Sequence, residues 1–202
     1  DYRFRLNFTA NVNESVSAFI GTVSSNDFGS GSADGSSAAG AGDVEQAYIN
    51  INSLFGSGGN WTIGQKHTTV ASGRVIGHDD WNNADSGIEG IWYSHDAGGS
   101  NLRLGLHEGQ ADHSTAGAGA VGNDVLTVEL DWGLNIPGMG DVTIAPYHIA
   151  ERTQGGLPGQ NDEAGTTNGA EVSGEFLGFG FDAELAKQGA NSASAFGISL
   201  NI

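Results

Sequence analysis

The stretch Tyr-Arg-Phe-Arg-Leu-Asn-Phe-Thr-Ala-Asn-Val at residues 2–12 decides the fold class of this chain. Apolar residues occupy every second position and polar residues lie between them, which is the pattern of an amphipathic β-strand. The run is longer than the strand of about five or six residues that is common in globular sheets. It matches the roughly 9–11 residues that a tilted strand needs to cross a bilayer. The stretch therefore predicts a membrane-spanning β-strand.

The same alternation returns along the whole chain, for example in Leu126, Val128 and Leu130. We expect a single domain over residues 1–202 that contains about ten strands. The expected strands lie near residues 1–12, 16–24, 44–54, 60–67, 87–95, 101–108, 124–132, 141–150, 171–186 and 192–202.

The connections between these strands alternate between short and long. The short ones are 13–15, 55–59, 96–100, 133–140 and 187–191, and the long ones are 25–43, 68–86, 109–123 and 151–170. Tight turns at one end and long loops at the other are typical of an up-and-down barrel in a bacterial outer membrane. The fold class expected is therefore all-β, an antiparallel up-and-down transmembrane β-barrel or part of a larger one.

Two places fit this pattern less well. The apolar residues between Val44 and Phe55 also match a helical stripe, although the asparagines and isoleucines among them favour a strand. Pro146 lies inside an expected strand, where its missing N–H predicts a bulge or a strand end. We expect a strand over 44–54 and an irregularity at Pro146.

The composition agrees with strands joined by flexible loops. Glycine accounts for 34 of the 202 residues, well above the usual level of about 7%. The absence of cysteine excludes a disulfide framework and a thiolate metal site. Seven Lys+Arg oppose 24 Asp+Glu, and the formal net charge of −17 makes nucleic acid an unexpected partner. The sequence contains no run of about 20 apolar residues, so it predicts no transmembrane helix. Because residue 1 already adjoins a strand pattern, we expect that a leader has been removed.

Five segments carry the motifs of a known protein family. They are Arg3–Val12, Gln46-Ala47-Tyr48-Ile49-Asn50, Trp61-Thr62-Ile63-Gly64-Gln65-Lys66, Arg74-Val75-Ile76-Gly77-His78-Asp79-Asp80-Trp81 and Phe181-Asp182-Ala183-Glu184-Leu185-Ala186. In these segments the chain resembles the alginate-export-like porins of bacterial outer membranes, which tend to show Gly-Arg-Gln at the third of them. The resemblance implies an outer-membrane β-barrel with a charged lumen, which in that family is basic and suits a polyuronate.

The chain departs from this family in two respects. The family's barrels have more strands than ten, and bacterial barrels usually end on an aromatic residue, whereas this chain ends in Leu200-Asn201-Ile202. The chain is therefore either a fragment of a larger barrel or a compact ten-strand version. An even number of strands permits closure, because the last strand then runs antiparallel to the first.

If the apolar residues face lipid, the residues that alternate with them face the lumen. The charged members of this inward set are Arg3, Arg5, Lys66, Arg103, Glu129, Asp131, Asp182 and Glu184, and Asn7, Asn50 and Asn52 accompany them. Charged rings in a pore select ions by sign, so these are the expected pore-lining residues. Because the acids at least match the bases in number, an alginate-like polyanion is not the expected solute. Alternatively, the charges pair across the lumen and hold a narrow barrel together.

Other candidate sites are less specific. His78-Asp79-Asp80-Trp81 and the segment 107–113 contain residue types that bind divalent cations, but neither has the spacing of a zinc or EF-hand site. We therefore expect solvated loops there and predict no metal or other cofactor. His148 and Glu151 are the nearest approach to a catalytic pair, and without an enzyme motif around them we expect no enzyme.

The tryptophans suggest an aromatic girdle. Trp61 and Trp132 both adjoin short turns, so a girdle predicts them at the same membrane face.

The expected function is that of a porin in the bacterial outer membrane, which allows passive diffusion of small hydrophilic solutes or ions. The acidic balance predicts a preference for cations. The expected partners are the lipid bilayer, these solutes, and further copies or subunits in a homo-oligomer or larger membrane complex. Two alternatives remain open: a structural or interaction barrel that anchors or sheathes a partner at the outer membrane, and a soluble acidic β-sandwich such as a sugar-binding module.

Overall fold

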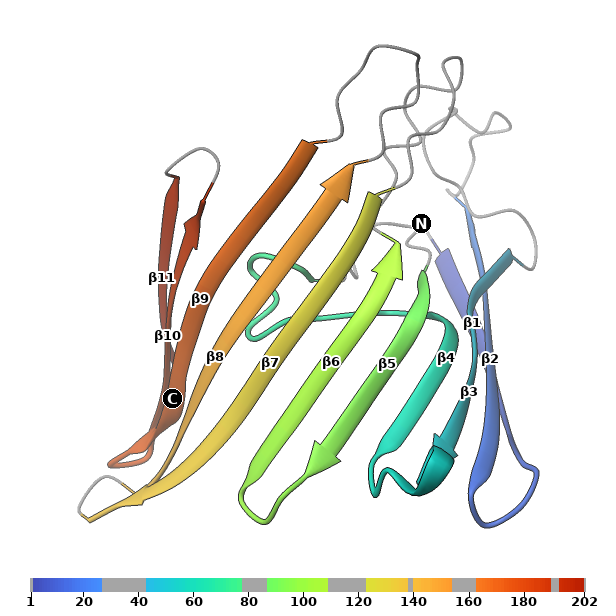
Figure 1. Cartoon of the computed structure of the whole chain (residues 1–202), viewed down its shortest axis with the longest axis horizontal. Coiled ribbons are helices and arrows are strands. Elements are labelled where there is room, and N and C mark those ends of the chain that lie inside the picture. The colour runs from blue at the N-terminus through green and yellow to red at the C-terminus, as the bar shows by residue number, and fades with distance from the viewer. Residues whose placement is uncertain are drawn as a thin grey trace.

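The computed structural model describes residues 2–26, 43–77, 87–108, 123–137, 140–153, 163–189 and 193–201. Within these ranges the chain forms one antiparallel sheet of 11 strands, in which neighbours in the sequence are neighbours in space. The strands are β1 (Tyr2–Asn11), β2 (Val16–Asn26), β3 (Asp43–Asn52), β4 (Asn60–Lys66), β5 (Ile88–Asp96), β6 (Ser100–Glu108), β7 (Asn123–Ile136), β8 (Gly140–Thr153), β9 (Glu163–Phe176), β10 (Phe179–Gln188) and β11 (Ser194–Asn201). Figure 1 shows this sheet as a curved wall of tilted strands. The expected all-β, antiparallel, up-and-down fold class is confirmed.

The helical content of the described residues is a single short 3-10 turn, η1 (Leu54–Gly56). No helix among the described residues has the length and apolar character needed to cross a bilayer. Strand β3 ends at Asn52, and Ser53 separates it from η1. A strand is therefore confirmed over most of the expected range 44–54, and the alternative helix does not form there.

The sheet is open between its two edge strands. Among the described residues β1 and β11 do not pair with each other. Because successive strands alternate in direction, the first and eleventh strands run the same way. The described residues form 11 strands where about ten were expected, so they do not give the even count that would allow antiparallel closure of the last strand on the first.

The extra strand comes from the region expected to form one strand over 171–186. Strand β9 ends at Phe176 and β10 begins at Phe179, with Leu177 and Gly178 between them at φ 53° and 82°. Positive φ at both central residues is the signature of a tight type I′ hairpin turn. Leu177 continues the apolar alternation into β10, which is why the sequence suggests an uninterrupted strand.

Strand β9 also begins earlier than expected and occupies much of the predicted long loop 151–170. Its first half is rich in glycine, threonine and asparagine, which favour loops. These residues are nevertheless paired on both sides, since Thr167 aligns with Ile149 of β8 and with Gln188 of β10. Pairing with two neighbours overrides the weak intrinsic preference of this segment.

Pro146 is neither at a strand end nor at a bulge, so that prediction was wrong. The β7–β8 register is the same on both sides of it, with Glu129 opposite Tyr147 and Trp132 opposite Ile144. The pairing is interrupted only between these two pairs. The missing proline N–H therefore weakens the ladder locally without shifting it.

The distribution of apolar and charged side chains over the two faces of the sheet is the reverse of that in a soluble protein. Large apolar residues on one face are exposed, for example Phe8 at 57% and Phe196 at 70%. Charged residues on the other face are buried, and Glu129 and Glu184 are each only 3% exposed. In a soluble sheet the apolar face is covered and the polar face is solvated. The described strands also belong to one sheet, whereas a β-sandwich requires two.

Candidate functional site

Residues 67–77, which follow β4, fold back against the polar face of the sheet. Figure 1 shows them leaving the end of β4 and crossing the sheet toward the β9–β10 side. We call residues 67–77 the inner segment and the face they cover the inner face. The inner segment turns back on itself through a bridge in which the Val70 N–H donates to the Ile76 carbonyl at 2.9 Å.

An apolar contact holds the middle of the inner segment on the sheet. Val70 is buried in a cluster with side chains from three strands of the wall: Val125, Tyr147, Ile149 and Ala186. Ala71 and Ile76 pack against the edge of this cluster. Burial of these side chains fixes the path of the segment, because apolar area removed from water stabilises the contact.

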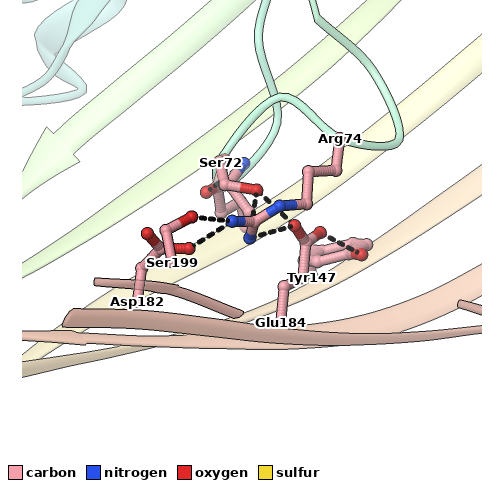
Figure 2. Close-up of polar contacts among 8 residues, drawn as sticks. Ser72, Arg74, Tyr147, Asp182, Glu184 and Ser199 are labelled. Carbon is pink, nitrogen blue, oxygen red and sulfur yellow. Dashed lines mark hydrogen bonds and ion pairs between the residues drawn. The ribbon is translucent and has the colours of Figure 1, made fainter. Parts of the chain in front are cut away.

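Arg74 joins the inner segment to β10 and β11, as Figure 2 shows. Its Nη2 donates to Asp182 Oδ2 at 2.5 Å and to Ser199 Oγ at 2.7 Å. Its Nη1 lies 3.4 Å from Glu184 Oε2. Charge-assisted hydrogen bonds of this kind are stronger than neutral ones. The hydrogen bond to Asp182 also raises the pKa of Arg74, so the guanidinium stays charged.

Glu184 is the most enclosed acid in this group. The Tyr147 hydroxyl donates to its Oε1 at 2.6 Å, and the Ser72 hydroxyl donates to its Oε2. Arg74 approaches the same Oε2. A buried carboxylate is costly unless hydrogen bonds and a counter-charge replace its water. These three partners, two of them on the inner segment, supply that replacement.

A second charged group lies on β6 and β7. Arg103 Nη2 donates to Glu129 Oε1 at 2.7 Å and to Asp131 Oδ1 at 2.6 Å. Arg103 and Glu129 are direct cross-strand partners, an arrangement that favours opposite charges. Glu129 Oε1 also accepts the Ala71 N–H at 2.9 Å. Glu129 therefore links the wall to the inner segment, as Glu184 does further round the sheet.

A third pair, between Arg5 and Glu45, depends on a bulge. Arg5 Nη2 donates to Glu45 Oε1 at 2.5 Å. The β2–β3 register shifts between Gly21 and Thr22, whose partners are Gln46 and Val44, so Glu45 has no partner of its own in β2. Bulges redirect side chains in this way. Simple alternation along β3 does not predict that Glu45 reaches Arg5.

Glu171 stands apart from these pairs. It aligns with Glu184 in β10 and with Ala145 in β8, which places it on the inner face. Among the described residues it has no hydrogen bond or ion pair. Like charges directly opposite each other on a sheet are destabilising. The inner face therefore carries an acid that no described cation contacts.

Most of the charged residues expected to line a pore lie on the inner face and are paired there: Arg5, Arg103, Glu129, Asp131, Asp182 and Glu184. Lys66 also lies on this face, with its Nζ 4.7 Å from the centre of the Trp92 ring. Asn50 accepts a hydrogen bond from Thr62 on the same face. Arg3 belongs to β1, and its side chain lies outside the described residues.

Sequence reasoning missed Arg74, Glu45 and Tyr147. Arg74 was expected in a solvated long loop, but the apolar residues Val70 and Ile76 beside it were a signal that this loop is partly buried. Tyr147 was not among the residues expected on the inner face. Its position opposite Glu129 in β8 places it there.

The remaining candidates have mixed outcomes. Trp61 is the second residue of β4 and Trp132 aligns with Ser100, the first residue of β6, so both lie at the short-turn end of the sheet. His148 and Glu151 are separated by an odd number of positions in β8, so their side chains point to opposite faces and do not form a catalytic pair.

The two loop segments considered for cation binding fall largely outside the described residues. This holds for His78-Asp79-Asp80-Trp81 and for residues 109–113. Within the described ranges no group of three or more His, Cys, Asp or Glu side chains is arranged to hold a metal ion.

The chain has a distant likeness to a solved structure. No protein-family model matches the sequence, and no curated protein matches it either. Among solved structures, the chain is similar to in-vitro folded OmpT, an outer membrane protein of Vibrio cholerae. The TM-score is 0.40 at 10% sequence identity, over 98% of this chain and 71% of that one.

Proposed function

We propose that this chain forms the wall of a β-barrel in a bacterial outer membrane and lets small hydrophilic solutes or ions cross by passive diffusion, without catalysis. The observation that carries the proposal is the reversed burial of the sheet. Apolar side chains are exposed on its outer face, while ion-paired side chains are enclosed on its inner face. Lipid is the solvent in which such an outer face is stable, and a polar interior is typical of transmembrane barrels.

The exposed apolar residues recur in successive strands along the sheet. They include Phe4 in β1, Ile91 in β5, Leu126 in β7 and Leu200 in β11. A soluble monomer rarely exposes a contiguous apolar surface of more than a few hundred Å². A band that extends over successive strands supports contact with a bilayer rather than with one protein partner.

The inner segment gives the proposed pore its narrow point. It crosses the same face that carries the charged groups, and it is held there by Arg74 and by the backbone of Ala71. A permeating solute would pass beside this segment and its acidic partners. Glu171, which has no ion pair among the described residues, supports the proposed preference for cations, because charged groups in a pore select ions by sign.

The resemblance to alginate-export-like porins is retained as a proposal for the family. The inner face supports a porin more than it supports an alginate carrier. Arg5, Arg74 and Arg103 are each paired with acids of the inner face, so they offer little free positive charge to a polyuronate.

Reconstitution in planar bilayers tests the proposal. The full chain should insert and give steady unitary conductance, with a reversal potential in a salt gradient that indicates cation preference. Extraction supplies an independent check, since the protein should need detergent to stay in solution. Stable solubility without detergent would contradict the lipid-facing surface, and insertion without conductance would contradict the pore.

A second function is a structural or interaction barrel at the outer membrane. It is favoured by the pairing of charges on the inner face and by the inner segment, which covers part of that face. Such a barrel would insert and remain electrically silent, and a partner would copurify with it. The same bilayer measurement therefore separates the two functions.

A further inference from the structure

The apolar outer face of the sheet is interrupted over β8 and β9. The flanking strands β7 and β10 expose large apolar side chains on this face, such as Leu130 at 39% and Leu185 at 59%. In the described parts of β8 and β9, the large apolar residue that is exposed is Phe176, which adjoins the β9–β10 turn. The lipid-facing band therefore has a gap that is two strands wide.

Small and polar side chains occupy this gap. They form consecutive cross-strand pairs and lie two positions apart along each strand, so all of them point to the same face. We call them the outer patch: Pro146 opposite Ala170, His148 opposite Asn168, and Ala150 opposite Thr166. Tyr147 and Glu171, which alternate with them, lie on the inner face.

The polar centre of the outer patch is a hydrogen bond between His148 and Asn168. His148 Nδ1 lies 2.7 Å from Asn168 Oδ1. An amide oxygen can only accept, so the imidazole N–H is on Nδ1, and the lone pair of the neutral ring is on Nε2. The pair therefore retains two amide N–H donors and one ring acceptor, none of which has a partner within the described part of the chain.

This pair lies at the level of apolar side chains. In β7 the residue aligned with His148 is Val128, and the exposed side chains of Leu126 and Leu130 flank Val128 on the same face. N–H groups without acceptors are costly at this depth, because a bilayer offers no water to replace the missing hydrogen bonds. The outer patch is thus poorly suited to contact lipid.

The chemistry of the outer patch is self-complementary. When two copies span the membrane in the same orientation, a two-fold axis along the membrane normal brings equal depths of the two chains together. The free amide N–H groups of Asn168 in one copy then meet the free Nε2 of His148 in the other, and the reciprocal contact forms at the same time. The small residues around the pair allow two walls to approach closely, as they do between packed transmembrane helices. Lys187 aligns with Asn168 in β10, and its flexible stem can carry the ammonium to the membrane boundary.

We propose that the outer patch binds a second copy of this chain, patch against patch. A copy is favoured over lipid because lipid tails cannot accept from the amide, and over an unrelated protein because the pair supplies both halves of its own contact. This inference rests on the proposed function, since it requires the outer face to lie in a bilayer. It deepens that function by naming a partner of the barrel wall.

Cysteine cross-linking tests the contact, because the chain contains no cysteine of its own. Thr166→Cys places a thiol on the outer patch, and Ile20→Cys places one on the outer face of β2, where the native side chain is 49% exposed. Each variant of the full chain is reconstituted in vesicles at a low ratio of protein to lipid and then oxidised. Thr166→Cys should form a covalent dimer, and Ile20→Cys should remain monomeric.

Substitutions identify the groups responsible, with self-association measured by sedimentation velocity in micelles. Asn168→Leu keeps the approximate size of the side chain and should weaken self-association about tenfold, as expected for the loss of one hydrogen bond on each side of the axis. Ala170→Trp leaves the His148–Asn168 pair in place and should also dissociate the copies, because its bulk holds them apart. This second variant keeps the test valid if Asn168→Leu does not fold. Ile20→Ala alters the outer face away from the patch and should have no effect.

Two results would overturn the inference: a monomer at every concentration of the unaltered chain, or equal cross-linking of Thr166→Cys and Ile20→Cys, which would indicate random collision. Because association is measured without a membrane potential, the outcome is independent of conductance. A monomer that conducts refutes the contact and leaves the pore intact. A dimer that does not conduct supports the contact and refutes the pore.

Discussion

Replacing Tyr147 by phenylalanine removes one hydroxyl from the inner face and leaves the aromatic ring in place. The ring belongs to the buried cluster around Val70, so packing is retained. The hydroxyl donates to Glu184 Oε1 at 2.6 Å, and both residues are almost fully buried. Glu184 would keep Ser72 and Arg74, which bind its other oxygen. One oxygen of a buried carboxylate would then have no donor among the described residues.

The expected loss follows from the nature of this bond. A hydrogen bond to a charged group contributes about 1.5–3 kcal/mol, and an unmatched buried acceptor cannot recover that amount from water. We therefore expect Tyr147→Phe to lower the free energy of unfolding by about 1.5–3 kcal/mol, which is roughly a 10- to 150-fold change in the unfolding equilibrium.

The measurement is reversible denaturant unfolding of the full chain in micelles, compared with a matched control. Tyr93→Phe also removes one hydroxyl, but that hydroxyl donates to the neutral Ser57 carbonyl at 3.2 Å near a turn. Its loss should cost no more than about 1 kcal/mol. Equal losses for the two variants, or a loss below about 0.5 kcal/mol for Tyr147→Phe, would refute the assignment of Glu184 as a buried charge that depends on this donor.

Four further predictions concern the wall and the inner segment. Arg74→Met should release the tip of the inner segment and raise the unitary conductance in planar bilayers, and an unchanged conductance would mean that the segment does not narrow the pore. Gly169→Ala should cost about 1–3 kcal/mol in denaturant unfolding, because its Cβ would overlap the buried Tyr147 ring, whereas Gly165→Ala in the same strand meets nothing closer than 3.9 Å and should be tolerated. Phe8→Arg should weaken insertion into vesicles by up to about 2–4 kcal/mol, as expected for a lipid-facing position, and unimpaired insertion would argue against lipid contact there. Glu171→Gln should raise the free energy of unfolding by up to about 1 kcal/mol and reduce cation selectivity, and an unchanged reversal potential would exclude it from selectivity.

The strands and their two faces could be predicted from the sequence because a period of two maps directly onto the faces of a sheet. Once the apolar run through Phe8 is assigned to the outer face, Arg5 must point inward, and the same reasoning places Arg103 and Glu129. No long-range information is needed for these assignments. They depend only on alternation within a single strand.

The path of the inner segment could not be predicted in this way. Nothing local to residues 67–77 indicates that Arg74 reaches Asp182 or that Val70 packs on Ile149, because both contacts join parts of the chain that are distant in sequence. The hairpin at Leu177 was missed for a different reason. A leucine at positive φ is uncommon, and its apolar side chain imitates the alternation of a continuing strand.

The inner face carries ion pairs and, beside them, the acid Glu171, which has none among the described residues. Arg5, Arg74 and Arg103 each neutralise buried acids, which is what a sheet needs if it is to enclose charge at all. Glu171 is not neutralised in this way, because it lies across from Glu184 and forms no ion pair with a described cation. A residue that only filled space there would be more favourable as glutamine, since like charges opposite each other cost stability. Under the proposed porin function, Glu171 is an acid that would attract cations to the inner face rather than hold the sheet together.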